Sequence, residues 1–293
     1  MGRILRTAMA ALLAAGLLIG PAPAADGSTT AVLVGAGDIA RCDASQDQAT
    51  ARLLDGIGGT VFTAGDNAYT RGTLWQFRHC YASSWGRHLR RTRPAPGNHD
   101  YETARAAGYF GYFGWRAGDA SRGWYRYDRG TWRIYVLNSN CSEVGGCYMG
   151  SRQQRWLAAD LAAHPRDCVL AIWHHPRFSS GYHGNQTQVR GLWVTLYNAG
   201  ADVILNGHDH DYERFAPQDY SGNADPMNGV REFVVGTGGA EQRSLRARKP
   251  NSEVSSDSAF GVLKLSLHPG SYDWQFVPVA GDSFTDSGSA ACH

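Results

Sequence analysis

Short apolar runs rich in β-branched and aromatic residues recur along the chain, separated by polar segments. Runs of this length, bounded by glycine, proline, asparagine or aspartate, are typical of buried β-strands. The last two runs are joined at Pro269 and Gly270, which indicates a hairpin. The pattern predicts strands at 31–35, 61–64, 132–138, 168–173, 203–205, 232–235, 260–267 and 272–279.

Three segments have helical patterns instead. Apolar positions fall on one face over 47–57 and 151–163, the latter beginning with Ser151 as a suitable N-cap, and 186–199 is also helical in pattern. Strands first alternate with helices and later form hairpins, which predicts an α/β fold. We expect a four-layer αββα sandwich, in which two mixed β-sheets stack face to face and are flanked by helices.

A glycine-rich and aromatic stretch occupies 101–124 and includes the run 108–114. Glycine-rich loops can bind phosphate, but this one lacks the Lys-Ser/Thr ending of a P-loop. Because aromatic side chains bury large areas, we interpret the stretch as an aromatic loop packed over the site or the core.

The first residues have the pattern of a secretory signal peptide. Arg3 and Arg6 precede an apolar stretch over 8–19, and small residues follow at 22–24. That stretch is shorter than the ~20 residues that span a bilayer, although a retained signal anchor is the alternative. We predict a signal peptide over 1–24, a secreted, extracellular protein and no membrane attachment after cleavage. Residues 25–293 then form a single domain, with a Ser/Gly-rich tail from 281 that is anchored only by Cys292.

All six cysteines lie in the part predicted to be exported, where an oxidising compartment permits disulfides. Six cysteines allow 15 pairings. Cys141 and Cys147 bracket a short loop with two glycines, so we expect these two to pair. The sequence contains no CxxC pair, so we do not expect a metal site built from cysteines. For the other four cysteines we expect the pairs Cys42–Cys80 and Cys168–Cys292.

The net charge is +2, and the charges are dispersed along the chain. Only the run 87–93 is densely basic, so we do not expect a nucleic acid as a stable partner. A small anionic substrate is compatible with this distribution. The sequence leaves the oligomeric state open.

Five short segments place possible metal ligands directly after apolar runs. In open α/β sheets the active site forms where strands end in loops. Each segment alone has a structural explanation, because Gly-Asp and Asn are common in turns. Their joint occurrence at strand ends predicts one metal site, built from 37–38, 65–69, 97–100, 173–176 and 207–210.

Oxygen ligands come from the first three segments. Asp38 and Asp66 each follow a glycine, which lets the backbone turn sharply and present a carboxylate. Tyr69 is three residues after Asp66, close enough for its phenol oxygen to reach the same ion, and a phenolate suits a trivalent iron. Asn98 offers a neutral amide oxygen, while the adjacent His99 can point at a substrate instead.

Nitrogen ligands come from the last two segments. His208 and His210 are separated by one residue, so both rings project to the same side of an extended backbone. His174 adds one more nitrogen, and imidazole suits zinc, iron, nickel and manganese alike. Adjacent His174 and His175 cannot both face the site from an extended strand, so we expect one of them to have a structural role or to support the metal ligands without binding the metal.

In this combination the motifs resemble those of the calcineurin-like metallophosphoesterases, and of the purple acid phosphatases in particular. Ala40 stands where the wider superfamily usually has the histidine of an Asp-x-His motif. Tyr69 follows the second aspartate, as in the purple acid phosphatases. The resemblance covers 32–279, and all five motifs occur in the family order.

The resemblance implies two metal ions, an iron(III) and a divalent zinc, iron or manganese ion. Asp66 would bridge them. The iron(III) would be held by Asp38, Asp66, Tyr69 and His210, and the divalent ion by Asp66, Asn98, His174 and His208.

The resemblance also implies two catalytic histidines. His99 matches a histidine that contacts phosphate, and His183, nine residues after His174, matches an outer histidine that acts as an acid. The family pattern can carry two adjacent histidines there, but Gly184 follows His183. Protonation of the leaving group would therefore rest on His183 or His99 alone.

The function implied is hydrolysis of a small phosphate ester by a metal-bound hydroxide, most directly by a phosphomonoesterase. No protein nucleophile is expected, because the sequence has no Gly-x-Ser-x-Gly elbow. A phosphodiesterase acting on nucleotide or phospholipid esters is one alternative, since the superfamily uses the same metals on diesters. A secreted metal- or phosphate-binding protein without catalysis is another, given the missing second histidine.

Overall fold

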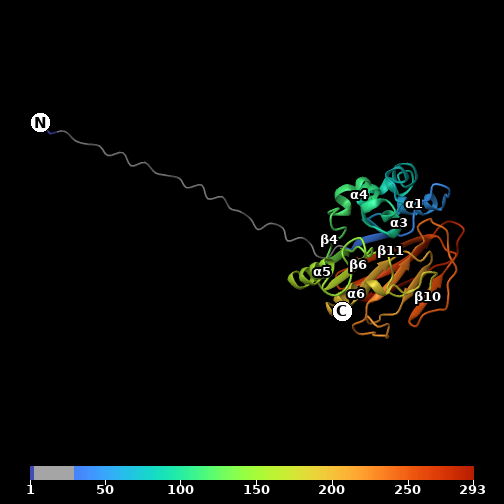
Figure 1. Ribbon diagram of the computed structural model, residues 1–293. Helices are drawn as coiled ribbons and strands as arrows, with labels where there is room; N and C mark the ends of the chain where they lie inside the picture. Colours follow the sequence, from blue (N-terminus) through green and yellow to red (C-terminus); the bar gives the residue numbers. More distant parts are fainter. Residues whose placement is uncertain (3–29) are drawn as a thin grey trace.

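The computed structural model describes residues 1–2 and 30–293 (Figure 1). The predicted signal peptide therefore lies outside the described residues, apart from its first two. Within the described part, no helix combines the length and apolar character needed to cross a membrane.

One sheet has six strands in the order β13-β12-β11-β1-β2-β3. Its first three strands in sequence run parallel, and the last three join them as an antiparallel meander. The strands are β1 (Ala31–Ala36), β2 (Thr60–Ala64), β3 (Thr92–Ala95), β11 (Gly261–His268), β12 (Ser271–Pro278) and β13 (Ser287–Ala291).

The other sheet has seven strands in the order β10-β8-β9-β7-β6-β5-β4. Its centre is parallel, with Ile134 opposite Leu170 and Leu170 opposite Val203, and its edges are antiparallel. The strands are β4 (Tyr125–Arg129), β5 (Trp132–Val136), β6 (Cys168–Ile172), β7 (Val203–Asn206), β8 (Tyr212–Phe215), β9 (Arg231–Val235) and β10 (Ser252–Ser256).

Helices surround the two sheets (Figure 1). The side chain of Ser151 accepts a hydrogen bond from the backbone N–H of Gln154, which confirms it as the cap of α5. The α-helices are α1 (Gln46–Gly56), α2 (Leu74–Gln76), α3 (Asn98–Tyr101), α4 (Ala107–Phe113), α5 (Arg152–Ala163) and α6 (Arg190–Asn198). Shorter π or 3₁₀ turns are η1 (Phe77–Tyr81), η2 (Trp85–Arg91), η3 (Ala104–Ala106), η4 (Gly114–Ala117) and η5 (Thr187–Val189).

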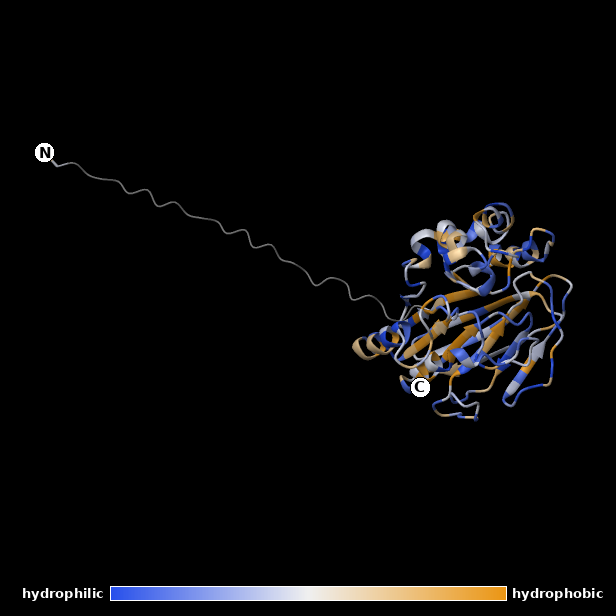
Figure 2. Ribbon diagram, viewed as in Figure 1, coloured by the Kyte–Doolittle hydropathy of each residue, from blue (hydrophilic) through white to orange (hydrophobic). Residues whose placement is uncertain are grey.

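The central strands are buried on both faces, which explains their continuous apolar runs (Figure 2). In β6, Leu170 belongs to the core between the two sheets, whereas Val169 belongs to a second core on the outer face. Leu157 of α5 and Leu192 of α6 complete that outer core. The predicted pair of mixed sheets flanked by helices is confirmed.

The aromatic stretch differs from its prediction. Residues 107–113 form the helix α4, so the interpretation as a loop is wrong. The rings of Tyr109 and Phe113 are fully buried and pack against Phe77 of η1. Burial of this aromatic face stabilises a helix that its glycines disfavour, because tertiary packing overrides weak intrinsic propensity.

Five strands have no counterpart in the sequence prediction: β3, β4, β8, β10 and β13. Four of them, β3, β4, β10 and β13, are edge strands, where few positions need to be apolar. We expected Cys292 alone to anchor the tail. This expectation is wrong, because β13 also pairs with β12 along Ser287–Ala291. The small residues of β13 have no strand pattern of their own, and pairing with the neighbouring strand β12 specifies the strand.

The three predicted disulfides are confirmed: Cys42–Cys80, Cys141–Cys147 and Cys168–Cys292. The third connects the start of β6 to the residue after β13, and so fastens the tail to the opposite sheet.

The longest and the shortest disulfide loops differ enough in length to test how much the disulfide of the tail contributes to stability. Cys168–Cys292 closes a separation of 124 residues and Cys141–Cys147 one of 6. By loop-closure entropy, replacing both cysteines by serine should lower the free energy of unfolding by about 5 kcal/mol for the long loop and about 2 kcal/mol for the short one. Urea unfolding of the two double variants measures both values, and equal losses would contradict the entropic argument.

Candidate metal centre

All five motifs follow the carboxyl ends of parallel strands, namely β1, β2 and β3 in one sheet and β6 and β7 in the other. Hydrogen bonds join these ends across the two sheets: Gly37 donates its N–H to Val235 O (2.8 Å), and His174 Nδ1 lies 2.8 Å from Ala64 O. The topology therefore gathers the five loops at one end of the sandwich.

The backbone is strained where the candidate ligands begin. Asp38, Asp66 and His208 have φ angles of 59°, 46° and 74°, in the left-handed region that residues other than glycine avoid. Each such residue costs about 1–3 kcal/mol, and strain of this kind clusters at functional sites. The motif glycines permit close approach, since a Cβ on Gly97 would lie 2.1 Å from Asp66 Oδ1 and one on Gly207 2.5 Å from Asp38 Oδ2.

One group of donors surrounds the hydroxyl of Tyr69. Tyr69 Oη lies 2.8 Å from Asp38 Oδ1, 3.1 Å from Asp66 Oδ2 and 3.1 Å from His210 Nε2. His210 Nε2 is also 3.4 Å from Asp38 Oδ1. These four side chains are the set that the family resemblance implies for one ion, and the fold brings their donor atoms together.

A second group surrounds His174. Its Nε2 lies 3.1 Å from Asn98 Oδ1 and 3.2 Å from Asp66 Oδ2. The ring of His208 is 5.0 Å from that of His174, measured between centroids. The set assigned to the other ion is therefore also assembled, and Asp66 Oδ2 is common to both groups.

Backbone carbonyls orient two of the imidazoles. Nδ1 of His174 bonds to Ala64 O and Nδ1 of His210 bonds to Glu241 O. A carbonyl can only accept, so each Nδ1 carries a proton, which leaves Nε2 as the nitrogen that can bind a metal once it is unprotonated. This is the arrangement that metal-binding histidines require.

The electrostatics of the site reflect its burial. Burial raises the pKa of Asp66, but the neighbouring histidines, His174 first and then His99 and His208, together outweigh this effect and the net pKa is lowered. For His174, burial lowers the pKa, but Asp66 and Asp38 raise it to about 9. Burial and the charges of Asp38 and Asp66 raise the pKa of Tyr69.

The donor chemistry fits two cations. Asp38 and Asp66 are 0% and 1% exposed, and buried carboxylates require a compensating charge. Carboxylate and phenol oxygens suit a hard ion such as iron(III), whereas the amide oxygen of Asn98 and the imidazoles of His174 and His208 suit a divalent ion.

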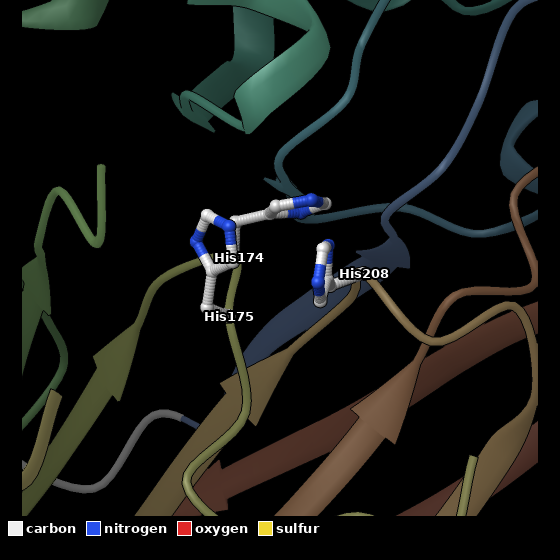
Figure 3. Close-up of side chains that lie close together, drawn as sticks. All are labelled: His174, His175 and His208. Atoms are coloured by element: carbon white, nitrogen blue, oxygen red, sulfur yellow. The ribbon is translucent and has the colours of Figure 1, made fainter. Parts of the chain in front are cut away.

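The backbone at His174 and His175 departs from the sequence expectation. We assumed an extended backbone at 174–175, but β6 ends at Ile172, and the bend that follows brings both imidazoles towards His208 (Figure 3). The ring of His175 lies 4.4 Å from that of His208 between centroids, and a ligand atom of each of the three histidines lies within 4.8 Å of the others. Ser139 holds His175 in place, with Oγ 2.8 Å from its Nδ1.

The two predicted catalytic histidines lie at the border of the site. His99 is partly exposed; its backbone N–H donates to Asp66 Oδ1 (2.8 Å) and its Nε2 is 3.9 Å from Asp66 Oδ2. His183 is exposed and stacks on His208 at 4.2 Å between ring centroids. Its backbone N–H donates to Asp209 Oδ1 (2.6 Å), so the aspartate between His208 and His210 positions the outer loop.

Sequence reasoning missed Arg243, whose Nη1 donates to Nε2 of His183 (2.9 Å). The two residues are 60 positions apart, and no motif surrounds Arg243 except the preceding glycine turn at 236–239. It also missed Ser139, which follows β5 by three residues. Neither residue type signals a site without knowledge of its spatial neighbours.

Comparison with known proteins agrees with this geometry. Residues 32–212 match the profile of the calcineurin-like phosphoesterase family. The chain is 36% identical over 126 residues to purple acid phosphatase 21 of Arabidopsis thaliana, a match that covers 40% of this chain and 28% of that protein. Purple acid phosphatase 22 of the same plant is 33% identical over 128 residues, covering 41% and 29%. The matches thus span less than a third of the length of these relatives.

Two solved structures share the fold. The purple acid phosphatase from yellow lupin (Lupinus luteus) seeds has a TM-score of 0.74 at 18% identity, covering 90% of this chain and 54% of that one. GAP50, described as the anchor in the inner membrane complex of Plasmodium, has a TM-score of 0.71 at 15% identity, covering 90% and 89%.

Metal analysis of purified variants tests the two donor groups. We expect about two ions per chain in the wild type, less than one in Asp66→Asn, because both groups lose their common oxygen, and about one in His174→Ala. Elemental analysis after dialysis measures the content, and circular dichroism checks the fold. Asp43→Asn is the control, since this carboxylate is exposed and, among the described residues, its side chain bonds to Arg41 alone. Full metal content in Asp66→Asn would exclude a shared ligand.

Proposed function

Because this chain belongs to the calcineurin-like phosphoesterase family, we propose that it hydrolyses small phosphate monoesters with two metal ions. The observation that carries the proposal is the position of Asp66 Oδ2, 3.1 Å from Tyr69 Oη and 3.2 Å from His174 Nε2. One oxygen thus lies next to a donor from each of the two groups, which would let the carboxylate of Asp66 serve both ions. The similarity to plant purple acid phosphatases supports a phosphatase activity.

We propose that Asp38, Asp66, Tyr69 and His210 hold iron(III), and that Asp66, Asn98, His174 and His208 hold a divalent zinc, iron or manganese ion. When bound, two such cations neutralise phosphoryl oxygens and activate water for in-line attack.

The chain's own residues orient the reaction. The Nδ1–H bonds of His174 and His210 to backbone carbonyls keep both Nε2 atoms aimed into the centre. The N–H of His99 fixes the second oxygen of Asp66, which leaves the partly exposed imidazole of His99 at the border to contact the phosphate. His183, stacked over His208, lies on the outer side, where we place the leaving group.

We also propose that the protein is secreted. Its three disulfides require an oxidising compartment for formation. The pattern of a signal peptide over 1–24 supports the same location.

A second candidate is a metal- or phosphate-binding protein without turnover. Gly184 stands where a second outer histidine would help to protonate the leaving group. The fold itself is compatible with a non-enzymatic role, since GAP50 is described as an anchor. Metal binding without hydrolysis of any phosphate ester would favour this candidate.

Matched aryl phosphomonoester and phosphodiester substrates test the proposal. The metal-loaded chain should prefer the monoester between acidic and alkaline pH. Asp66→Asn should lower turnover by at least about 1,000-fold, because both ions depend on its carboxylate. Steady-state assays measure both effects. A preference for the diester would reassign the protein as a phosphodiesterase, and near-normal turnover by Asp66→Asn would contradict the bridging role.

Spectroscopy tests the iron assignment independently of turnover. An iron(III) phenolate absorbs visible light by charge transfer, so the wild type loaded with iron should be coloured and Tyr69→Phe should not be. The absorption spectrum of each protein, recorded at equal iron content, measures the difference. A visible band retained in Tyr69→Phe would reject the phenolate ligand.

A further inference from the structure

Arg243 is connected to both groups of candidate ligands, to one through His210 and to the other through His183 and His208. Its backbone N–H donates to the carbonyl of His210 (3.1 Å), while Nδ1 of His210 bonds to Glu241 O. The segment that carries Arg243 is therefore fastened at two points to a candidate ligand of one ion. Its guanidinium reaches His183, whose ring stacks on His208, a candidate ligand of the other ion.

The charge of Arg243 is only partly neutralised. Its Nη2 donates to Glu241 Oε1 (3.1 Å), but the other oxygen of Glu241 binds Arg41. One carboxylate is thus shared by two guanidinium groups. The hydrogen bond from Nη1 to His183 Nε2 is 2.9 Å long and ends on an imidazole nitrogen that accepts the bond.

An anionic oxygen is a stronger acceptor than such a nitrogen. A phosphate oxygen adds the attraction between opposite charges, which a neutral imidazole nitrogen lacks, and the planar fork of the guanidinium can hold two oxygens at once. A phosphate that enters the site can therefore displace His183 from Nη1. The side chain of Arg243 is 30% exposed, which leaves it accessible from solvent.

We propose that Arg243 binds the phosphoryl group of the substrate and selects for phosphate monoesters over diesters. This inference rests on the proposed function. A monoester carries up to two negative charges, since the second pKa of a phosphate is about 6, and it offers three non-bridging oxygens. A diester carries one charge and offers two such oxygens, so it gains less from an additional cation beside the two metal ions.

The guanidinium of Arg243 also provides a second positive group in a site that has one outer histidine instead of two. His183 is followed by Gly184 rather than by a second imidazole. Arg243 supplies a positive group next to His183 from a segment that is distant in sequence, and Tyr182 supports it, with its ring centroid 5.6 Å from the guanidinium carbon.

The test compares Arg243→Gln with the wild type. For an aryl phosphomonoester we expect kcat/KM to fall about 10- to 100-fold, the effect of losing a hydrogen bond to a charged group. Inhibition by orthophosphate should weaken by a similar factor, whereas kcat/KM for a matched diester should fall by less than about 3-fold. Arg243→Lys, which keeps the charge but not the fork, should recover part of the loss.

Arg246→Gln is the matched control. Arg246 lies three residues after Arg243 and, like it, packs on Tyr182. Its guanidinium carbon is 4.7 Å from the centroid of the Tyr182 ring. Among the described residues it makes no hydrogen bond to His183 or Glu241. It should leave phosphate inhibition and both kcat/KM values within about 2-fold of the wild type.

Orthophosphate binding separates this inference from the proposed function. If the wild type hydrolyses no ester, the proposed function fails, but calorimetric titration of the metal-loaded protein with orthophosphate still compares Arg243→Gln with the wild type. Weaker binding at unchanged metal content supports Arg243 as the phosphate-binding residue. Equal binding, an equal loss for monoester and diester, or a loss of metal from Arg243→Gln would each overturn the inference.

Discussion

The burial of two carboxylates, Asp38 and Asp66, at the end of the sandwich is the constraint on which the candidate centre depends. A buried carboxylate is tolerated only where donors or cations surround it. The N–H of His208 donates to Asp38, the N–H of His99 donates to Asp66, and the hydroxyl of Tyr69 lies within hydrogen-bond distance of both. Because these donors come from three different loops, the same two charges draw the loops of both sheets into one arrangement.

The strained backbone of the site is consistent with this constraint. Asp38, Asp66 and His208 adopt positive φ angles that their side chains disfavour, and they do so directly after strands whose ladders are complete. The N–H of Asp38 bonds to Gly65 O (3.0 Å), so the strained turns also support one another. The buried parallel strands thus hold the loops rigidly, and the loops direct the side chains of the candidate ligands towards one another.

Much of this arrangement could be predicted from the sequence because its signals are local. Apolar runs marked the buried strands, and the motif residues follow those strands directly, so the loops that meet at one end were identifiable. Strands such as β10 and β13 escaped prediction because edge strands have little apolar pattern of their own, and α4 escaped because its glycines hide a helix that packing stabilises. The bend after Ile172 was equally invisible, and with it the approach of His175 to His208.

Contacts between distant segments are what the sequence could not supply, and they decide the chemistry at the border of the site. The fold is shared with the two solved structures described above, and a shared fold does not by itself distinguish a monoesterase from a diesterase. The distinction has to lie in groups that meet the outer part of the substrate. In our proposal those groups are His183 and Arg243, which touch each other across 60 positions. Since a guanidinium remains charged wherever the protein is folded whereas an imidazole loses its charge near neutrality, a border with one histidine and one arginine keeps an anion-binding group over a wider pH range than a border with two histidines.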